Sequence, residues 1–306
     1  MEMPGHVPVL KEEAVQLLLT DPNGTYVDAT LGGGGHAAAI LDSLGVDGRL
    51  VGLDADPAAV QGARAAVPVP EPRFVARRAR FSGMREALQG LGVGPVHGIL
   101  ADLGLSSLQL DDPVRGFSFS APGPLDMRLD PALPETAESL LRSIDDRELT
   151  RILRELGELP RPRPAVRAIR AALSSGTPLT ATALRQSLEP LFRGPQRPRR
   201  LSQVFQALRI AVNDELSELQ ALLHESPSLL RPGGTLCVIA YHSLEDRFVK
   251  NAFRPPRPSD PNQPLTPTPW IPLTKKPVRP SAEEARRNPR ARSAKLRAAR
   301  RKEEDA

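Results

Sequence analysis

Short apolar runs alternate with amphipathic stretches over the first third of the chain. The runs have the length of buried strands and cover residues 25–27, 49–54, 74–76 and 96–102. Helical periodicity fills the intervals, and Asp56-Pro57 is typical of a helix start with Asp56 as the N-cap. Strands that alternate with helices pair in parallel, with helices on both faces of the sheet. The hydrophobic pattern therefore predicts an α/β domain with a mostly parallel sheet.

This alternation stops after the fourth strand. Helical periodicity and proline-rich joints continue without a strand through the segments 135–159, 164–173 and 180–191. The earlier pattern then returns with a helix, a turn and a strand at 203–223, 231–234 and 235–241. The simplest architecture is an α/β domain that is interrupted by an all-helical insertion and then completed.

We accordingly divide the chain into four parts. Residues 1–107 form the first part of the α/β domain, and 108–198 form the helical insertion, which we expect to recognise the substrate. Residues 199–254 complete the α/β domain, and 255–306 form a tail. The tail starts with the proline-rich stretch Pro255–Pro280, which predicts an extended and partly mobile segment.

The end of the tail carries a basic run from Arg286 to Lys302 that no acidic residue interrupts. Clustered Arg and Lys favour an arm that follows phosphates, because binding there releases condensed counterions. A solvated helix with a frayed end is the alternative. The net charge of +5 also favours a polyanionic partner such as nucleic acid, although a GC-rich genome inflates arginine as well.

The remaining composition excludes several classes of protein. One cysteine and five histidines, none in a ligand-spaced cluster, predict neither a disulfide framework nor a metal site. The chain has no apolar run of about 18 residues and no charged-then-apolar leader over Met1–Thr20. We therefore expect a soluble, cytoplasmic protein without a membrane partner.

A glycine turn is the first element with chemical content. Gly32–Gly35, with His36 directly after it, follows the strand at 25–27 and precedes a helix that starts at Ala37. Strand, glycine turn and helix form the geometry in which the backbone approaches a nucleotide-like ligand closely. The turn also satisfies the loose dinucleotide fingerprint. The turn by itself is therefore compatible with either NAD or S-adenosylmethionine as the cofactor.

Three acidic residues shift this balance. Asp28, Asp54 and Asp102 each end a predicted parallel strand, so they should meet at one crevice outside the sheet. Asp54 lies about 20 residues after the glycines and suits the ribose hydroxyls of either cofactor. Three carboxylates would repel a pyrophosphate but suit an ammonium and a sulfonium. The acids therefore favour S-adenosylmethionine, the alternative being that some of them are helix caps or surface groups.

Several longer strings resemble one family closely. They are Asp102–Phe119, Gly123–Asp130, His6–Leu10, Phe205–Ile210, His242–Arg247 and Asn288–Ser293. Along the chain, from about residue 6 to 299, these strings follow the same order as in the RsmH (MraW) family, which they resemble. Members of that family methylate the exocyclic N4 of a decoding-centre cytidine in bacterial 16S ribosomal RNA. The resemblance implies a Rossmann-like class I methyltransferase domain with a helical insertion. It also implies S-adenosyl-L-methionine as cofactor and 16S rRNA of the small ribosomal subunit as partner.

The resemblance also implies a set of cofactor-binding residues. By position in the matching motifs they are Gly34, Gly35, His36, Asp54, Phe81, Asp102 and Gln109. The chain departs from the family at three places. Gly33 stands where a larger residue is common, and Gln203 stands where an arginine is common. Residues 159–164 replace a helix of the Tyr-Gly-Glu-Glu type. These departures concern contacts of the insertion and the grip on RNA more than the cofactor.

The cytosine N4 amine is weakly nucleophilic, since its lone pair is delocalised into the ring. A group that accepts a hydrogen bond from this amine would draw the lone pair out of the ring plane. Asp102 or a nearby backbone carbonyl could accept it, although Asp102-Leu-Gly-Leu is not the Asn/Asp-Pro-Pro-aromatic string of many amine methyltransferases. His242 is a second catalytic candidate, because it follows the last strand and could border the target base. The alternative is a purely structural role for this segment, with Ser243 as the cap of a helix. Cys237 lies in an apolar run, which predicts an inert thiol and disfavours methylation at C5.

Two further questions stay open at the level of the sequence. Arg115, Phe117, Phe119 and Arg128 suit a clamp on a flipped nucleotide and equally suit a packing cluster of the insertion. The rival functions are an amine methyltransferase acting on DNA or protein, and a non-catalytic RNA-binding protein that responds to S-adenosylmethionine.

Overall fold

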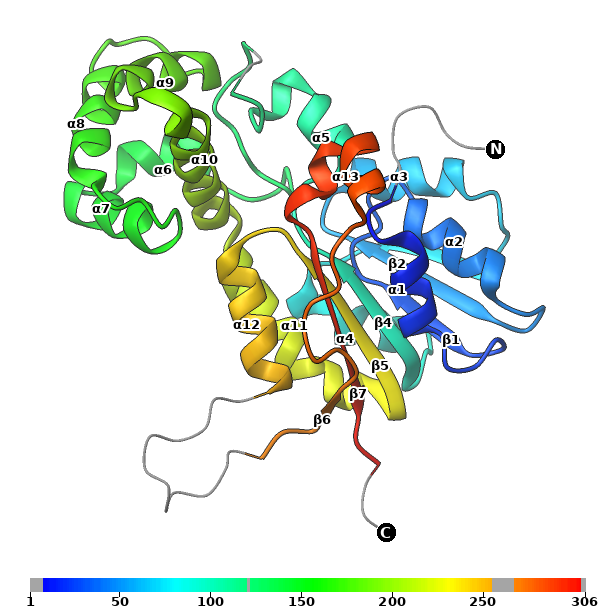
Figure 1. Cartoon of the computed structure of the whole chain (residues 1–306). Helices are drawn as coiled ribbons and strands as arrows, with labels where there is room; N and C mark the ends of the chain where they lie inside the picture. The colour runs from blue at the N-terminus through cyan, green and yellow to red at the C-terminus, as the bar shows by residue number, and fades with distance from the viewer. Residues whose placement is uncertain (1–7, 120–121, 255–266, 304–306) are drawn as a thin grey trace, which may run out of the picture. The chain divides into compact units, whose positions relative to one another are not determined.

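The structure is a computed structural model that describes residues 8–119, 122–254 and 267–303 (Figure 1). The chain divides into two compact units. The sheet unit consists of Met1–Gly104 and Ser217–Ala306, and the helical unit is Leu105–Leu216. The first two residues of the string His6–Leu10, and the part of the proline-rich stretch from 255 to 266, lie outside the described residues.

A seven-stranded sheet in the order β3-β2-β1-β4-β5-β7-β6 forms the centre of the sheet unit. The strands are β1 (Thr25–Asp28), β2 (Arg49–Asp54), β3 (Phe74–Arg78), β4 (Val96–Asp102), β5 (Leu230–Ala240), β6 (Trp270–Pro272) and β7 (Lys295–Arg301). Strands β1 to β5 run parallel, and β7 runs antiparallel to both of its neighbours. The predicted mostly parallel α/β class is confirmed.

The strand order reverses direction at β1, which lies between β2 and β4. In register, Asp28 of β1 stands opposite Gly52 of β2 and Leu100 of β4. The three strands therefore end near one another, at the kind of switch point where open α/β sheets bind ligands. We call this edge, with Asp28, Asp54 and Asp102, the carboxyl edge.

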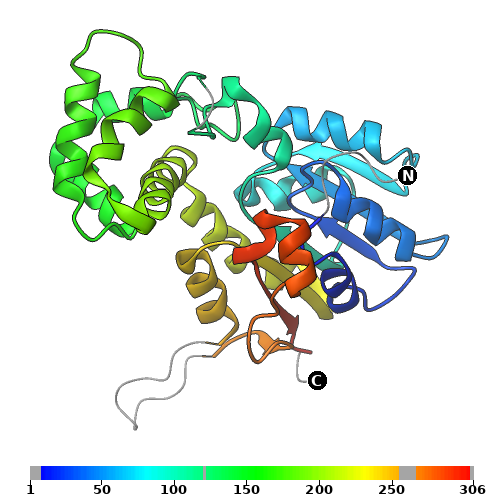
Figure 2. The ribbon, with the colours of Figure 1, turned by 45° about the horizontal axis from the view of Figure 1, so that its top comes forward.

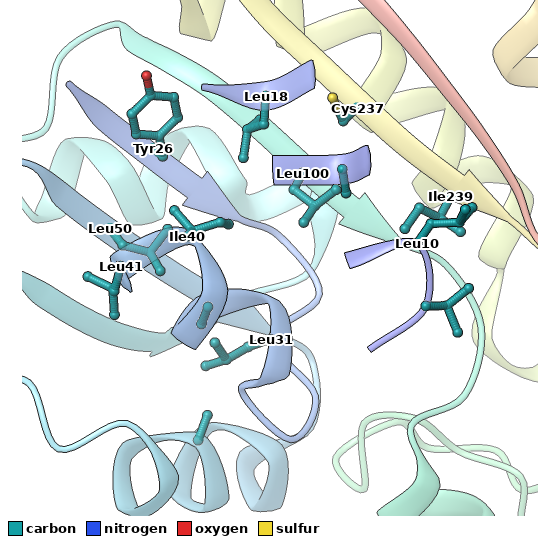
Figure 3. Close-up of a cluster of buried hydrophobic side chains, with 14 of the residues drawn as sticks. Leu10, Leu18, Tyr26, Leu31, Ile40, Leu41, Leu50, Leu100, Cys237 and Ile239 are labelled. Carbon is teal, nitrogen blue, oxygen red and sulfur yellow. The ribbon is translucent and has the colours of Figure 1, made fainter. Parts of the chain in front are cut away.

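Helices cover both faces of the sheet. The sheet unit contains α1 (Lys11–Leu18), α2 (Gly35–Ser43), α3 (Pro57–Ala66), α4 (Met84–Gly90), most of α11 (Glu215–Leu229), α12 (Ser243–Phe253) and α13 (Ala282–Arg287). Tyr26 and Leu100 point to one face, where they join Ile40 of α2 in a buried cluster (Figure 3). The adjacent Val27 and Ile99 point to the other face and join a second cluster. This alternation explains why the strands are apolar on both sides.

Two local predictions had different outcomes. Asp56 is the N-cap of α3, and its side chain accepts from Ala58 N at 3.0 Å, as predicted. The predicted turn at 231–234 instead lies within β5, where the pairing with β4 shifts between Leu230 and Thr235. Gly233 has a φ of 77°, so the chain makes a local irregularity there without ending the strand.

The helical unit contains α5 (Ser107–Asp111), α6 (Ala137–Ser143), α7 (Asp146–Glu155), α8 (Pro162–Leu173), α9 (Ala181–Leu188) and α10 (Arg197–Asn213). Helices α6 to α10 gather around one buried cluster and lie together in both views (Figures 1 and 2). Among the residues described between 108 and 198, no strand is present beyond one isolated bridge. The helix predicted at 135–159 is two helices, because Asp145 caps a new one.

The boundary expected at 198 differs from the division at 216. Leu201, Val204 and Phe205 of α10 pack into the core of the helical unit, which places this helix there rather than with the sheet. The helix predicted at 203–223 also breaks, since Asp214 adopts a left-handed conformation with a φ of 51° between α10 and α11.

The last part of the predicted basic C-terminal arm is a strand of the sheet instead. Residues 295–301 form β7, which pairs with β5 on one side and β6 on the other, as the red strand beside yellow β5 shows (Figure 1). Leu296 and Ala298 are fully buried in the sheet. Lys295 and Arg297 both form ion pairs with Asp246, at 3.2 and 2.7 Å. The apolar positions between the basic ones thus make a strand whose charges are partly neutralised.

Candidate functional site

The glycine turn connects β1 to α2 at the carboxyl edge. Gly34 is the N-cap of α2 with a φ of 81°, a conformation that glycine adopts without strain. A Cβ on Gly34 would lie 3.1 Å from Val67 Cγ2, so there is also little room for a side chain. Leu31 N donates to Leu53 O at 2.9 Å, which ties the turn to β2. The turn thus presents the start of a helix beside the ends of β1 and β2, the arrangement the sequence predicted.

The structure brings the three predicted acids together. Asp28 is fully buried, and the neighbouring charges of Asp54 and Asp102 each raise its pKa. Burial is the largest cause, and the pKa of Asp28 rises to about 6 even though His36 and a hydrogen bond from Thr30 N lower it. Asp28 Oδ2 is buried without a hydrogen-bond partner among the described residues. A buried carboxylate in this state is costly unless a cationic group approaches it.

Asp54 is fixed by the backbone on both sides. Its Oδ2 accepts from Gly32 N and its Oδ1 from Asp56 N, each at 2.9 Å. These bonds set the plane of the carboxylate, whose two oxygens offer about four acceptor positions in all. The residue therefore shapes the glycine turn and can also accept from a diol.

Asp102 is held by two hydrogen bonds. Tyr241 donates its hydroxyl hydrogen to Asp102 Oδ1 at 2.8 Å, and the backbone N of Asp102 donates to Thr30 Oγ1 at 2.6 Å. The side chain is only 16% exposed, and burial raises its pKa to about 7. The Tyr241 hydrogen bond lowers that pKa, whereas the charge of Glu245 raises it. Both forms of the carboxyl group are thus populated near neutral pH.

The ring of His36 faces this carboxylate from α2. Its Nε2 lies 3.0 Å from Val9 O, and because a carbonyl oxygen only accepts, Nε2 carries the proton. Nδ1 lies 3.6 Å from Asp102 Oδ2, which is an electrostatic contact rather than a hydrogen bond. The residue is buried, and burial lowers its pKa. The imidazole is therefore packed and largely neutral.

His242 has a different environment from the one predicted. It is itself the N-cap of α12, in place of Ser243, and its side chain accepts from Glu245 N. Glu245 completes the cap, because its Oε2 accepts from the backbone N of Tyr241 at 2.8 Å and of His242 at 3.2 Å. The ring is thus engaged at the start of α12, and a role of His242 beside a target base stays a prediction.

Two predicted cofactor residues have structural partners of their own. Phe81 starts the 3₁₀ turn Phe81–Gly83 and packs, half-buried, against the core cluster of the sheet unit. Gln109 belongs to the helical unit, where its Oε1 accepts from Ser106 N at 3.0 Å in the capping box of α5. The structure describes these contacts and leaves the cofactor roles as predictions.

The residues considered for a nucleotide clamp form packing contacts within the helical unit. Arg115 donates to the carbonyl oxygens of Arg128 and Leu129, at 2.8 and 2.9 Å, and its guanidinium lies 5.8 Å from the ring of Phe117. Arg128 forms an ion pair with Asp126 at 2.8 Å. The Phe119 and Phe205 rings meet edge to face, with centroids 5.4 Å apart. These contacts favour the packing alternative.

Sequence reasoning missed Tyr241 and Glu245. Tyr241 directly follows β5, the neighbour of β4, so its place after a predicted strand was the available signal. The side chain that crosses from there to Asp102 needs the three-dimensional structure to be found. Among the described residues, no group of three His, Cys, Asp or Glu side chains is arranged to hold a metal ion. No helix in the described ranges is long and apolar enough to span a membrane.

Comparisons with known proteins agree with the resemblance. The model of the MraW methylase family matches residues 3–302. A relative from Sorangium cellulosum is named ribosomal RNA small subunit methyltransferase H and is 46% identical, over 97% of this chain and 90% of its own length. A relative of the same name from Thermomicrobium roseum is also 46% identical, over 97% of this chain and 93% of its own length.

Similarity to solved structures is weaker. TrmN from Thermus thermophilus aligns with a TM-score of 0.43 and 12% identity, over 95% of this chain and 48% of that chain. The assignment therefore depends on the sequence matches, which run almost from end to end. The chain belongs to the MraW methylase family.

Proposed function

We propose that the protein is an S-adenosylmethionine-dependent methyltransferase that methylates the exocyclic N4 of a decoding-centre cytidine in bacterial 16S rRNA. The names of the relatives support a ribosomal RNA of the small subunit as the substrate class. The cofactor supplies an electrophilic methyl group when it is bound. The observation that carries the proposal is Asp102, a mostly buried carboxylate held by Tyr241 at the carboxyl edge.

The residues of the carboxyl edge fit this cofactor. Asp54 would accept hydrogen bonds from the ribose hydroxyls, and the backbone of Gly34, Gly35 and His36 would approach the cofactor closely. The unpartnered, buried oxygen of Asp28 would face its positively charged end. Gln109, whose side-chain oxygen accepts from Ser106 N, stays a cofactor-binding residue that only the resemblance implies. Phe81 would contribute an apolar surface.

Asp102 would act on the target amine. In its ionised form it would accept a hydrogen bond from the exocyclic amine, draw the lone pair out of the ring plane and stabilise the positive charge that develops on nitrogen. Tyr241 keeps one oxygen of Asp102 in place. The other oxygen, 3.6 Å from His36 Nδ1, is left for the substrate. The reacting group is thus oriented before the substrate arrives.

The alternative position on cytosine, C5, would require a thiolate that attacks C6. The one cysteine, Cys237, is fully buried in the middle of β5, and burial raises its pKa, so the thiolate is not formed at neutral pH. Its sulfur lies among the buried side chains of the sheet (Figure 3). These properties support the amine as the acceptor.

One experiment separates this function from its rivals. Methyl-labelled S-adenosylmethionine is offered with small-subunit particles, free 16S RNA, DNA and protein, and labelled RNA is digested to nucleosides. We expect label in 16S RNA or the particles, at N4 of cytidine. Label only in DNA or protein would identify another amine methyltransferase, and RNA binding without transfer would identify a non-catalytic protein. Because ribosomal subunits are assembled in the cytoplasm, the proposal also places the protein there.

A further inference from the structure

The helical unit carries an open cleft between α7 and α8, outside the carboxyl edge. Its volume is about 830 Å³, and five arginines line it against three acidic residues. The arginines are Arg147, Arg151 and Arg154 on α7, and Arg163 and Arg167 on α8. All five side chains are exposed. We call this surface the arginine cleft.

The spacing of these residues places them on one surface. On α7 the arginines follow each other at intervals of four and three residues, which keeps them on one face of the helix. On α8, Arg163 and Arg167 are four residues apart and therefore also neighbours on one face. Two helix walls thus present positive charge to a shared space.

Each acidic residue of the cleft has a structural partner. Asp145 caps α7 by accepting from Glu148 N at 2.7 Å, and Asp146 forms an ion pair with Arg170 at 2.7 Å. Glu148 forms an ion pair with Arg151 at 2.6 Å. Arg154, Arg163 and Arg167 form no ion pair with any described residue. Five arginines against three acids thus leave the lining of the cleft with a net charge of +2.

The lining also indicates the kind of ligand. Val166 is the one apolar lining residue and is 3% exposed, and no aromatic side chain belongs to the lining. A protein partner would need an apolar or aromatic centre to its interface, and nucleic-acid bases would need aromatic rings on which to stack. Guanidinium groups match the geometry of phosphate oxygens, and a nucleic-acid backbone presents phosphates in series.

We propose that the arginine cleft binds the phosphate backbone of the rRNA substrate. This inference rests on the proposed function and adds a second contact surface to it. The cleft supplies affinity and orientation without reading the base sequence, because phosphate contacts carry no sequence information. The chemistry remains with the carboxyl edge.

The test compares two double variants of the full-length protein. Arg154→Gln with Arg167→Gln removes one arginine from each wall of the cleft. The control, Arg142→Gln with Arg185→Gln, removes two arginines of the same unit that pair with acids four residues away, Glu138 on α6 and Glu189 directly after α9. Both variants lose the same charge, and unchanged thermal melting of each shows that the fold is intact.

The readouts are the Kd for a 16S rRNA transcript at several salt concentrations, and the kinetics of methyl transfer. We expect the cleft variant to bind RNA about tenfold more weakly at physiological salt, with a slope of log Kd against log salt lower by roughly 1.4, about 0.7 for each lost phosphate contact. Its KM for RNA rises while kcat at saturating RNA stays unchanged. The control keeps the wild-type values.

Two outcomes overturn the inference. One is a cleft variant whose Kd and salt slope equal those of the control. The other is a polyglutamate competitor that displaces no RNA but binds the cleft of the wild type and not of the variant, which would identify an acidic protein as the partner. If the wild-type protein methylates RNA in the same assay, either outcome counts against the role of the arginine cleft and not against the proposed function. Absence of wild-type transfer would count against the proposed function instead.

Discussion

The carboxyl edge of the sheet unit and the arginine cleft of the helical unit are opposite in charge and in burial. At the edge, Asp28 is fully buried and Asp102 nearly so, and burial raises the pKa of both. In the cleft the arginines are exposed. One region places few charges where water is excluded, and the other places several charges in water.

This difference separates chemistry from binding. A carboxylate whose pKa lies near neutrality can exchange hydrogen bonds or protons with a substrate at working pH. An exposed guanidinium keeps its charge and contributes to affinity in a way that salt screens. If the comparison holds, changes at the carboxyl edge lower kcat or cofactor affinity. Changes in the cleft raise the KM for RNA.

The largest effect is expected for Asp102→Asn. The amide keeps the shape of the side chain but cannot become a carboxylate acceptor, so we expect kcat to fall by about 10²- to 10⁴-fold. Since the ionised form is the active one, wild-type activity should rise with pH through about 7, the raised pKa of Asp102. Single-turnover methyl transfer from pH 5.5 to 9 measures both. A kcat within threefold of wild type would remove Asp102 from the chemistry.

The next effect is expected for Asp54→Asn. Loss of a charged acceptor for the ribose should weaken cofactor binding by roughly 1.5–3 kcal/mol, which calorimetry measures as the Kd for S-adenosylmethionine. Asp42→Asn is the matched control, because Asp42 is an exposed acid on α2. Since Asp54 also holds Gly32 N, melting without cofactor must be compared as well. An unchanged Kd would show that the ribose does not lie at Asp54.

The sequence predicted the carboxyl edge well because strand ends follow from local patterns. A short apolar run that ends in an acid places that acid at the end of a strand, and parallel pairing then brings Asp28, Asp54 and Asp102 to one edge. Tyr241 was missed because its contact with Asp102 depends on the length and direction of a side chain across two strands. No local pattern contains that information.

For the basic segments, in contrast, local patterns did not predict which residues lie on an exposed surface. The run at 286–302 has a higher density of positive charge than the helices of the cleft, yet its last part is the buried strand β7. Pairing with β5 and the ion pairs of Lys295 and Arg297 with Asp246 come from residues about fifty positions away. The arginines of α7 and α8 are dispersed along the sequence and meet only in the folded unit. Net charge therefore indicated the class of partner but not the surface.

A smaller effect, on stability, is expected for Asp28→Asn. The pKa of Asp28 is raised from 3.8 to about 6 in the folded protein, so its protonated form favours folding. The contribution is present below pH 3.8 and is lost as the pH rises to about 6, at a cost of roughly 2–3 kcal/mol for the wild type. The variant cannot ionise and should be more stable than wild type by about that amount at pH 8, and equally stable at pH 3.5.

Urea unfolding at the two pH values measures this difference. Asn can still accept from Thr30 N, so the local hydrogen bond is kept. If Asp28 faces the positively charged end of the cofactor, the same variant should bind S-adenosylmethionine more weakly than wild type, even though it is more stable than wild type at pH 8. A variant that gains no stability at pH 8 would show that the buried charge is compensated within the protein itself.

The smallest effect is expected for Cys237→Ala, which tests whether burial alone makes a residue reactive. Like Asp28, Cys237 is fully buried in the sheet unit, but its burial raises the pKa of a thiol that must be ionised to react. The variant should lose about 1 kcal/mol of stability from the small cavity, and its kcat and its product should be those of wild type. Melting, single-turnover rates and nucleoside analysis of the methylated RNA measure these quantities. A large loss of kcat in a folded variant would revive methylation at C5, because only that reaction needs a cysteine nucleophile.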